Sequence, residues 1–491
     1  MRRIRPLLFW LFVGLFFCTT SGVLFYTFGY RFNFERGIFI YTGSISIKST
    51  PETVEIRIDN ELIPQKKLGL LNRSIHIGGL TPGEHFIDVS APGYIPWSKK
   101  TTVQSGLSTE FWNVFLVKEK NAQESIAGTA GTLKIFQARE QGLLAVAKKQ
   151  GSLFTVDILD TNAKTTEEVF SLSDVSLPEN GEENIEWSPD DKKILIPIEQ
   201  AGGRNYFVVD RATKQTTSLH DLAKIKTTGS LRNPRWDPAN RNFLLYVTNN
   251  VLNRIDAGAT DATPLFVKEN VRDYNFSGQN IYYLSNDNGI IYRIPAGSVD
   301  STPTQITTIP ITLLQDSLYA LILYDDARLT IREQKTGKLW VYNKISPSEI
   351  VLKTIVDSNV KGVQFSDDGK KLLFFTNNEI FAYFLRDWEA QPVRASGTMI
   401  QIARFSNTIK NVVWAEDYEH VIFSLGNAAK IIELDNRDRR NMADLATFSA
   451  PLLQILPRFD ENYVYFVSPG NAETNAVSRF PFSEKSGLFG F

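Results

Sequence analysis

The chain repeats one short pattern: an aromatic residue, a polar turn, and then an apolar run that is typical of a β-strand. Six clear copies each begin with an anchor aromatic, and most neighbouring anchors are about 40–50 residues apart. The interval between the anchors at 276 and 365 is about twice as long, and a degenerate unit at 313–322 fills it. An earlier unit at 133–146 makes eight. Such a repeat constrains the fold strongly, because each unit can bury its apolar faces only against neighbouring copies. The six clear copies are anchored at Trp187, Trp236, Phe276, Phe365, Trp414 and Phe459.

Each unit continues with further strand-like segments. A third apolar segment follows at 206–210 and again at 380–384, and a polar turn leads into a fourth at 339–341. Units of about 40–50 residues with four strands are typical of β-propeller blades. The sequence therefore predicts an all-β chain whose residues 132–482 form a propeller of eight four-stranded blades, or of seven if a terminal unit is linker or closing strand. The last unit lacks a clear fourth strand, so we expect the ring to borrow one; residues 483–491 are expected to be a tail.

Two of the turns carry a more specific pattern. The segments 187–193 (WSPDDKK) and 365–371 (FSDDGKK) resemble the repeats of TolB-type and related WD-like propellers. That resemblance implies a propeller that is often periplasmic or extracellular, and it implies no particular activity. The paired aspartates suit hairpin turns, where Asp accepts hydrogen bonds from nearby backbone. No Asp-x-Asp-x-Asp-Gly loop accompanies them, so calcium is not expected.

Residues 7–30 contain no charged side chain and are long enough to cross the hydrocarbon core of a bilayer as a helix. The basic excess lies on the N-terminal side of this run, which favours a cytoplasmic N-terminus. The sequence thus predicts a short cytoplasmic segment (1–6), a transmembrane signal anchor (7–30) in the cytoplasmic membrane, and an extracytoplasmic bulk. The alternative is a signal peptide cleaved near 18–22, but the apolar run continues to Phe28. The charged residues that set this bias are Arg2, Arg3 and Arg5 before the run, and Arg31, Glu35 and Arg36 after it.

Residues 44–117 show short alternating strands separated by Pro-Gly turns, which predicts a small β-sandwich. The segments 49–60, 80–89 and 92–97 resemble the PEGA domain, a small β-sandwich of bacterial surface and signalling proteins, although Thr53-Val54 stand where Gly-Ala is usual. The resemblance implies an extracytoplasmic spacer or adhesion module of a bacterial cell-envelope protein. The small, polar residues 118–131 are expected to link the sandwich to the propeller.

The charge balance and the absence of known motifs argue against nucleic-acid binding, metal binding and catalysis. Lys and Arg total 53 against 54 Asp and Glu, so no net field favours nucleic acid. The four histidines lack ligand spacing, Cys18 is the only cysteine, and no nucleophile or phosphate-binding motif occurs. We therefore expect no catalytic residue, no metal and no cofactor. His85, beside a Pro-Gly turn, is expected to be structural and satisfied by a nearby backbone group.

The residue before each anchor aromatic is often polar, and this position gives one candidate ligand-binding set. If the innermost strands turn it towards the axis, a ring of mixed charge results; the favoured alternative is that these side chains pair with neighbouring blades or solvate an edge. The predicted function is non-catalytic: a membrane-anchored extracytoplasmic scaffold whose propeller recognises a protein, a peptide or an envelope polymer. The alternative is an exported propeller enzyme, a hydrolase or lyase acting on glycans or peptides. The candidate set is Glu186, Arg235, Asn275, Gln364 and Arg458.

Overall fold

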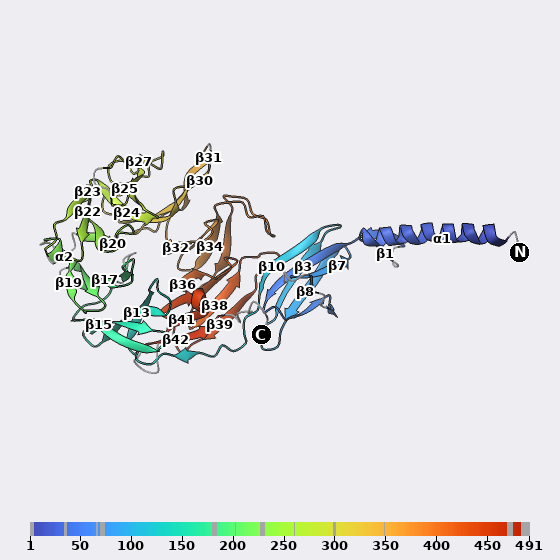
Figure 1. The fold of residues 1–491 in the computed structure, drawn as a ribbon, viewed down its shortest axis with the longest axis horizontal. Helices are drawn as coiled ribbons and strands as arrows, with labels where there is room; N and C mark the ends of the chain where they lie inside the picture. Colours follow the sequence, from blue (N-terminus) through green and yellow to red (C-terminus); the bar gives the residue numbers. More distant parts are fainter. Residues whose placement is uncertain are drawn as a thin grey trace.

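A computed structural model shows an N-terminal helix, a region of two facing sheets, and a ring of eight further sheets, in that order along the chain (Figure 1). The predicted all-β fold with an apolar terminal helix is therefore confirmed. The predicted tail (483–491) lies outside the described residues, as do Arg2, Arg3, Glu35 and Arg36. The structure describes residues 4–33, 37–64, 67–68, 74–178, 184–201, 203–225, 231–259, 261–297, 301–347, 349–468 and 475–482.

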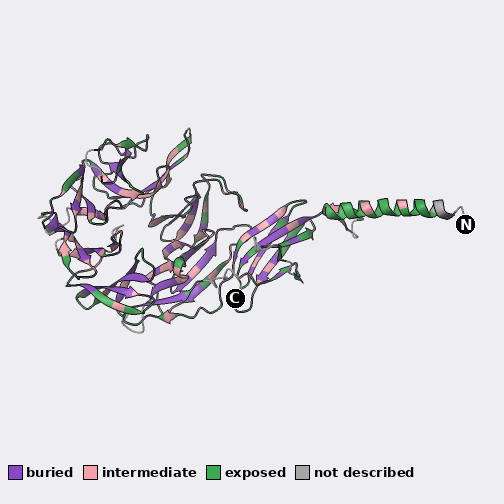
Figure 2. Ribbon diagram, in the orientation of Figure 1, coloured by how far each residue is buried: buried purple, intermediate pink, exposed green. Residues whose placement is uncertain are grey.

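Helix α1 (Ile4–Thr27) projects from the rest of the molecule, and its side chains from Leu8 onwards are almost all exposed (Figure 2). Residues Leu8–Thr27 have a mean hydropathy of 2.0 over their most apolar window. At about 1.5 Å per residue, a helix of this length matches the hydrocarbon core of a bilayer. A short hairpin, β1 (Tyr30–Asn33) and β2 (Ile38–Tyr41), follows the helix directly.

The second part is a sandwich of two four-stranded sheets, with strand orders β10-β3-β7-β6 and β5-β4-β8-β9. Strand β10 runs parallel to β3, whereas the other pairs in the two sheets are antiparallel. Ile45, Ile56, Ile87 and Phe111 belong to the apolar core between the sheets. The strands are β3 (Gly43–Thr50), β4 (Glu55–Ile58), β5 (Glu61–Leu62), β6 (Lys67–Leu68), β7 (Ser74–Leu80), β8 (Gly83–Ser90), β9 (Trp97–Val103) and β10 (Ser108–Phe115).

The third part is the propeller, and within the described residues it has eight four-stranded antiparallel sheets, so both terminal repeats form full blades. The first strands of neighbouring sheets contact one another, and the last blade packs against the first: Leu144 and Val146 share a core with Tyr465 and Val467. The first four blades are β12 (Thr132–Gln137), β13 (Leu143–Gln150), β14 (Leu153–Asp160) and β15 (Thr165–Ser173); β16 (Glu186–Trp187), β17 (Lys193–Gln200), β18 (Gly203–Asp210) and β19 (Thr216–Ser218), with helix α2 (Leu219–Leu222) after it; β20 (Leu231–Trp236), β21 (Phe243–Thr248), β22 (Val251–Asp256) and β23 (Leu265–Lys268); and β24 (Val271–Ser277), β25 (Asn280–Ser285), β26 (Ile291–Pro295) and β27 (Thr304–Gln305).

The remaining four blades complete the ring. They are β28 (Tyr319–Asp325), β29 (Arg328–Glu333), β30 (Leu339–Ser346) and β31 (Glu349–Val356); β32 (Gly362–Phe365), β33 (Lys371–Phe375), β34 (Glu379–Phe384) and β35 (Met399–Arg404); β36 (Ile409–Trp414), β37 (His420–Leu425), β38 (Ala428–Glu433) and β39 (Met442–Thr447); and β40 (Gln454–Arg458), the 3-10 turn η1 (Phe459–Glu461), β41 (Tyr463–Ser468), β42 (Ala476–Pro481) and β11 (Glu124–Ser125).

Strand β11 comes from before the first blade and forms the fourth strand of the last one. The main-chain N–H of Ile126 donates to the carbonyl of Val477 at 2.9 Å. The Glu124 carboxylate pairs with Arg479 of β42 (Oε2 to Nε 2.9 Å). The expected borrowing of a closing strand is therefore confirmed. The donor is segment 118–131, which was expected only to link the two β regions, so this segment also fastens the ring.

The anchor aromatics explain why the repeat has its sequence. Trp236 and Trp414 are buried, and the indole N–H of each donates to the backbone of the preceding blade, at Glu186 O (3.2 Å) and Gln364 O (3.3 Å). In the turns that follow, aspartates have the predicted capping role: Asp368 Oδ1 accepts from Ser366 Oγ (2.6 Å) and from the N–H of Lys370 (2.9 Å). Trp236 and Trp414 thus join a blade to its neighbour, while the turn after the anchor starts the next strand.

The sandwich packs directly against the propeller through side-chain contacts. Lys99 and Trp97 of β9 reach Glu433 at the end of β38, the indole at 2.9 Å, and Lys99 also donates to the carbonyl of Asp435 at 3.0 Å. Strand β9 was not predicted, because its inward positions include Lys99 and a threonine, which hide the apolar alternation. Lys99 faces inward because the propeller supplies its partners.

Candidate binding site

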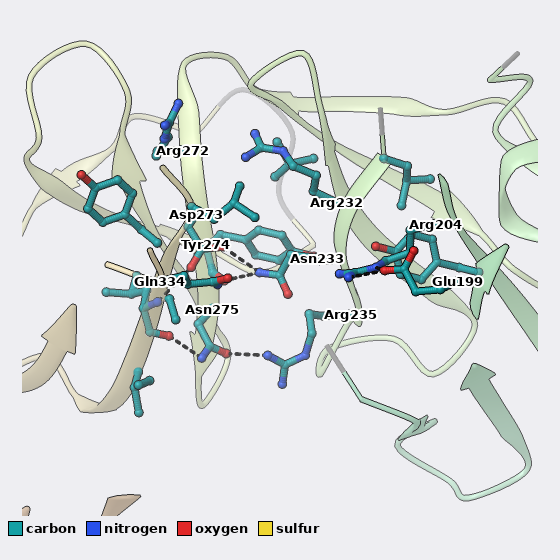
Figure 3. Close-up of a pocket in the computed structure, with 18 residues that line it drawn as sticks. Glu199, Arg204, Arg232, Asn233, Arg235, Arg272, Asp273, Tyr274, Asn275 and Gln334 are labelled. Atoms are coloured by element: carbon teal, nitrogen blue, oxygen red, sulfur yellow. Dashed lines mark hydrogen bonds and ion pairs between the residues drawn. The ribbon is translucent and has the colours of Figure 1, made fainter. Parts of the chain in front are cut away.

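A pocket of about 400 Å³ opens among the first strands of three consecutive blades, β20, β24 and β28. Strands β17 and β18 of the preceding blade contribute to one side (Figure 3). One part of the wall is apolar and includes Leu231, Val247 and Tyr319. The other part carries arginine, amide and carboxyl groups, so the pocket can bind a ligand by both its apolar and its polar groups.

Two of the five predicted ring residues, Arg235 and Asn275, line this pocket, and a third, Glu186, contacts Arg235 from the preceding blade. Arg235 Nε donates to Glu186 Oε2 (2.8 Å), and Arg235 Nη1 donates to Asn275 Oδ1 (3.3 Å). Asn275 Nδ2 in turn donates to the carbonyl of Leu321 at 2.7 Å. A chain of hydrogen bonds therefore crosses four blades, from β16 to β28. Figure 3 shows the part of it between Arg235 and the backbone of β28.

The structure does not bring the other two ring residues to this pocket. Gln364 Oε1 accepts from the main-chain N–H of Trp414 in the next blade (3.1 Å). Arg458 is 4% exposed in its side chain and pairs with Asp460 and Glu461 in the turn of its own blade, at 2.9 Å to each carboxylate. These contacts are of the kind expected if the position serves blade packing. A ligand role for the full ring stays a prediction.

The sequence pattern did not predict the pocket residues that stand three and four positions before an anchor aromatic. Arg232 and Arg272 each stand four residues before an anchor aromatic, and Asn233 and Asp273 stand three before it. Equivalent residues of the two blades contact each other: Asn233 Nδ2 donates to Asp273 Oδ1 at 2.9 Å. Aligning β20 with β24 on their anchors shows the paired positions, and that alignment is the signal that could have found them.

Asp273 is the carboxyl group whose environment is most unusual here. It is 7% exposed, and it also accepts a hydrogen bond from the main-chain N–H of Leu321 (2.9 Å). Burial raises the pKa of Asp273 to about 7, because desolvation outweighs these hydrogen bonds and the nearby arginine. In contrast, the charge of Glu186 raises the pKa of Arg235, so that guanidinium stays protonated. The pocket therefore has a permanent cation beside a carboxyl group that titrates near neutrality.

His85 and His420 are buried and hydrogen-bonded to neighbouring groups. As predicted, His85 is satisfied by a backbone group, the carbonyl of Thr81 (Nε2 to O 2.6 Å), and its other nitrogen meets Asp59 (2.6 Å). Burial lowers the pKa of His420, but its contact with Asp417 (2.7 Å) outweighs burial and raises it. Among the residues that the structure describes, no three His, Cys, Asp or Glu side chains are grouped to hold a metal ion.

Comparison with known proteins finds similarity to solved structures. No protein-family model matches the chain, and no curated protein matches it. Solved structures that are similar include Saccharomyces cerevisiae Sqt1 (11% identity, 74% of this chain and 99% of that one, TM-score 0.45). The C-terminal WD40 domain of Sif2 is 10% identical over 74% and 99% of the two chains (TM-score 0.46), and the Dos1 propeller is 10% identical over 74% and 95% (TM-score 0.48).

The eight sheets in a closed ring define this chain as a β-propeller protein with a two-sheet sandwich before the ring. That assignment depends on the sheets and their order, since identities near 10% describe no more than a fold. The resemblances to the PEGA domain and to TolB-type propellers are carried by the quoted residues alone and stay predictions.

Proposed function

We propose that this chain is a membrane-anchored binding scaffold outside the cytoplasm, and that its propeller recognises a protein or peptide partner at the pocket between β20, β24 and β28. The observation that carries the proposal is the line of polar side chains from Glu186 through Arg235 to Asn275, held in one geometry by contacts between blades. Ligand sites generally combine an apolar wall with a few fixed polar groups, and this pocket has both.

The junction between α1 and the hairpin supports an uncleaved anchor. Phe25 of the helix stacks on Phe39 of the hairpin, with ring centroids 5.7 Å apart. Arg31 Nη1 donates to the carbonyl of Tyr26 at 2.8 Å, and Thr42 Oγ1 donates to that of Gly29 at 2.6 Å. Because the helix end is packed against the hairpin that leads into the sandwich, cleavage near 18–22 would remove part of a folded unit.

The exposed side chains of the hairpin also fit a membrane surface. Phe28 is 66% exposed, Phe39 61% and Tyr41 42%. Aromatic residues are enriched at the boundary between lipid and water, where a ring can lie among the headgroups. We propose that this hairpin lies at the outer boundary of the membrane. The basic residues before the helix favour this orientation, with the propeller on the extracytoplasmic side.

An exported enzyme is the second candidate, and Asp273 is the observation that favours it, since catalytic carboxyl groups often have a pKa near the working pH. Both oxygens of Asp273 are engaged, with Asn233 and with the N–H of Leu321. Among the described residues, the pocket has one other carboxyl group, Glu199, which is paired with Arg204 (Oε1 to Nε 2.7 Å). A binding role therefore explains this site better than acid–base catalysis.

The proposal is tested by affinity capture from detergent-solubilised native membranes with the tagged full-length chain. The comparison is between the wild type and a variant with Arg232→Gln and Arg235→Gln, and the control is Arg404→Gln, whose side chain is 77% exposed on another blade. We expect the pocket variant to lose partners that the control retains. Identical partners from all three forms would show that the pocket is not the binding element.

A further inference from the structure

We propose that the pocket holds the carboxylate of a peptide, either an Asp or Glu side chain or a C-terminal carboxylate. This inference rests on the proposed binding function and names the chemistry of its ligand. It follows from the charge of the pocket, from the direction of its guanidinium groups, and from the groups that surround them.

The pocket has an excess of fixed positive charge. Four arginines line it, Arg204, Arg232, Arg235 and Arg272, against Glu199 and Asp273 in the wall and Glu186, which pairs with Arg235 from the preceding blade. Burial holds Asp273 partly protonated near neutral pH, so its charge offsets little of this excess. An anionic ligand group is therefore favoured over a neutral one or a cation.

The guanidinium groups are placed to form a fork around such an anion. In Figure 3, Arg204 points towards Asn233 at the centre of the pocket, Arg235 lies below Asn233 and is joined to Asn275, and Arg232 lies above them. Arg232 Nη2 also donates to Asn250 Oδ1 at 3.0 Å. The side chain of Arg235 is 36% exposed and that of Arg204 is 24% exposed, so both groups are reachable by a ligand. Planar guanidinium groups bind carboxylates with two parallel hydrogen bonds.

Arg272 has a different role and is not part of the fork. Its Nη2 donates to the carbonyls of Leu314 and Gln315, at 2.8 and 2.6 Å, and to that of Ser317. In Figure 3 its guanidinium lies at the edge of the view, away from Asn233 and Asn275. These bonds hold the loop before β28, which forms one rim of the pocket.

The remaining groups favour a peptide over a phosphate or a sulfated polymer. Gln334 lines the pocket with an amide donor and acceptor that match a peptide backbone, beside the amides of Asn233 and Asn275, which are held in contacts between blades. Leu231 and Val247 give an apolar surface for a neighbouring side chain.

The test measures fluorescence polarisation with the full-length chain in detergent micelles at two salt concentrations. Four labelled probes are compared: an Asp/Glu-rich peptide with an amidated end, an Ala/Ser peptide with a free C-terminal carboxylate, the same peptide amidated, and a phosphoserine peptide. We expect one or both carboxylate probes to bind more tightly than the amidated control, and the first two probes distinguish the two sources of carboxylate.

Three variants assign this binding to the pocket. Arg232→Gln should weaken the carboxylate probe about tenfold or more, the size expected when a charge-assisted pair is lost. Glu199→Gln should strengthen it several-fold, because a competing carboxylate is removed from Arg204. Arg404→Gln, outside the pocket, should leave it unchanged. A merely structural role for these residues would not make one substitution tighten binding while another loosens it.

Binding of neither carboxylate probe above the amidated control, tighter binding of the phosphopeptide, or weaker binding in Glu199→Gln would each overturn the inference. Failure of all four probes would also overturn it. These outcomes are distinct from failure of the proposed function: if the membrane-capture partners still depend on Arg232 and Arg235 while no carboxylate probe binds, the scaffold function stands and the ligand is of another class.

Discussion

Lys99 of the sandwich and Glu433 of the propeller form an ion pair in which both side chains are buried, at 0% and 4% exposure. The ammonium group also donates to the carbonyls of Asp435 and Arg439, each at 3.0 Å, and the carboxylate accepts from the indole of Trp97. A buried charge with this many partners fixes one arrangement of its neighbours. The sandwich and the propeller are thus joined as one body.

Replacing Lys99 by Met should destabilise the docking of the sandwich on the propeller. The change leaves the Glu433 carboxylate buried without its cation, and loss of one partner of a buried pair costs about 3–5 kcal/mol. The midpoint of thermal unfolding should fall, and protease should cut more readily within 118–131. The double variant Lys99→Met with Glu433→Gln should recover part of the loss.

The neighbouring Lys100 provides a matched control. It pairs with Glu84 on the surface, where the two side chains are 55% and 66% exposed. Lys100→Met should not change the unfolding midpoint measurably, since exposed pairs are screened by water and salt. Equal effects of the two substitutions would contradict the special role of the buried pair.

Closure of the ring by β11 predicts a strong effect of a proline at Ile126. Its main-chain N–H donates to Val477, and its side chain is 2% exposed in the core between the last and first blades. Ile126→Pro removes the hydrogen bond and distorts the closing segment, so the free energy of unfolding should fall by about 3 kcal/mol or more. Ile126→Val keeps the bond and should lose only about 0.5–1.5 kcal/mol.

Hydrogen exchange locates this effect. In Ile126→Pro, the amides of β42 and β41 should exchange faster than in the wild type, while those of β24 and β25, on other blades, should change least. Uniformly faster exchange in all blades would indicate a general loss of stability and would contradict a local role in closure.

Asp273 makes a specific prediction about pH. Its pKa rises from about 4 in the unfolded chain to about 7 in the folded one, so folding favours the protonated carboxyl group. Its contribution to stability is fully present below about pH 4 and is lost as pH rises through 7. The change is at most about 1.4 kcal/mol per pH unit within this window.

The measurement is the difference in unfolding free energy between the wild type and Asp273→Asn from pH 4 to pH 8. The variant carries no titrating group at this position, so it should gain stability relative to the wild type as pH rises. Asp357→Asn serves as the control, since Asp357 is 88% exposed in its side chain. A pH-independent difference for Asp273→Asn would contradict the raised pKa.

The repeats in the sequence predicted a propeller of eight blades, with seven as the alternative, because the spacing between aromatic anchors is a property of the chain alone. The site was predicted only in part. Arg235 and Asn275 were found because they precede an anchor, but Arg204 lies on β18, the third strand of the preceding blade, and reaches the pocket only through the packing of adjacent blades. Likewise, the inward direction of Lys99 depends on a partner 334 residues away, which no local pattern records.

The anchor tryptophans give a last prediction about how the blades hold together. Trp414 Nε1 donates to the carbonyl of Gln364, and the same contact recurs between Trp236 and Glu186. Trp414→Phe keeps most of the buried ring and removes the donor, so it should cost about 1 kcal/mol, near the net value of one hydrogen bond.

Trp414→Ala also removes the ring from the core between β33 and β37 and should cost about 3–5 kcal/mol. The control is Trp112→Phe in the sandwich, whose indole binds Glu110 at a half-exposed position and joins no blades. Denaturant unfolding measures all three. Three other repeats already carry Phe at the anchor, Phe276, Phe365 and Phe459, each half-buried against a core cluster, so the pattern needs a large packed ring more than it needs the hydrogen bond. If Trp414→Phe destabilised the chain as much as Trp414→Ala, the hydrogen bond between blades, and not the packing of the ring, would be the main contribution of Trp414 to stability.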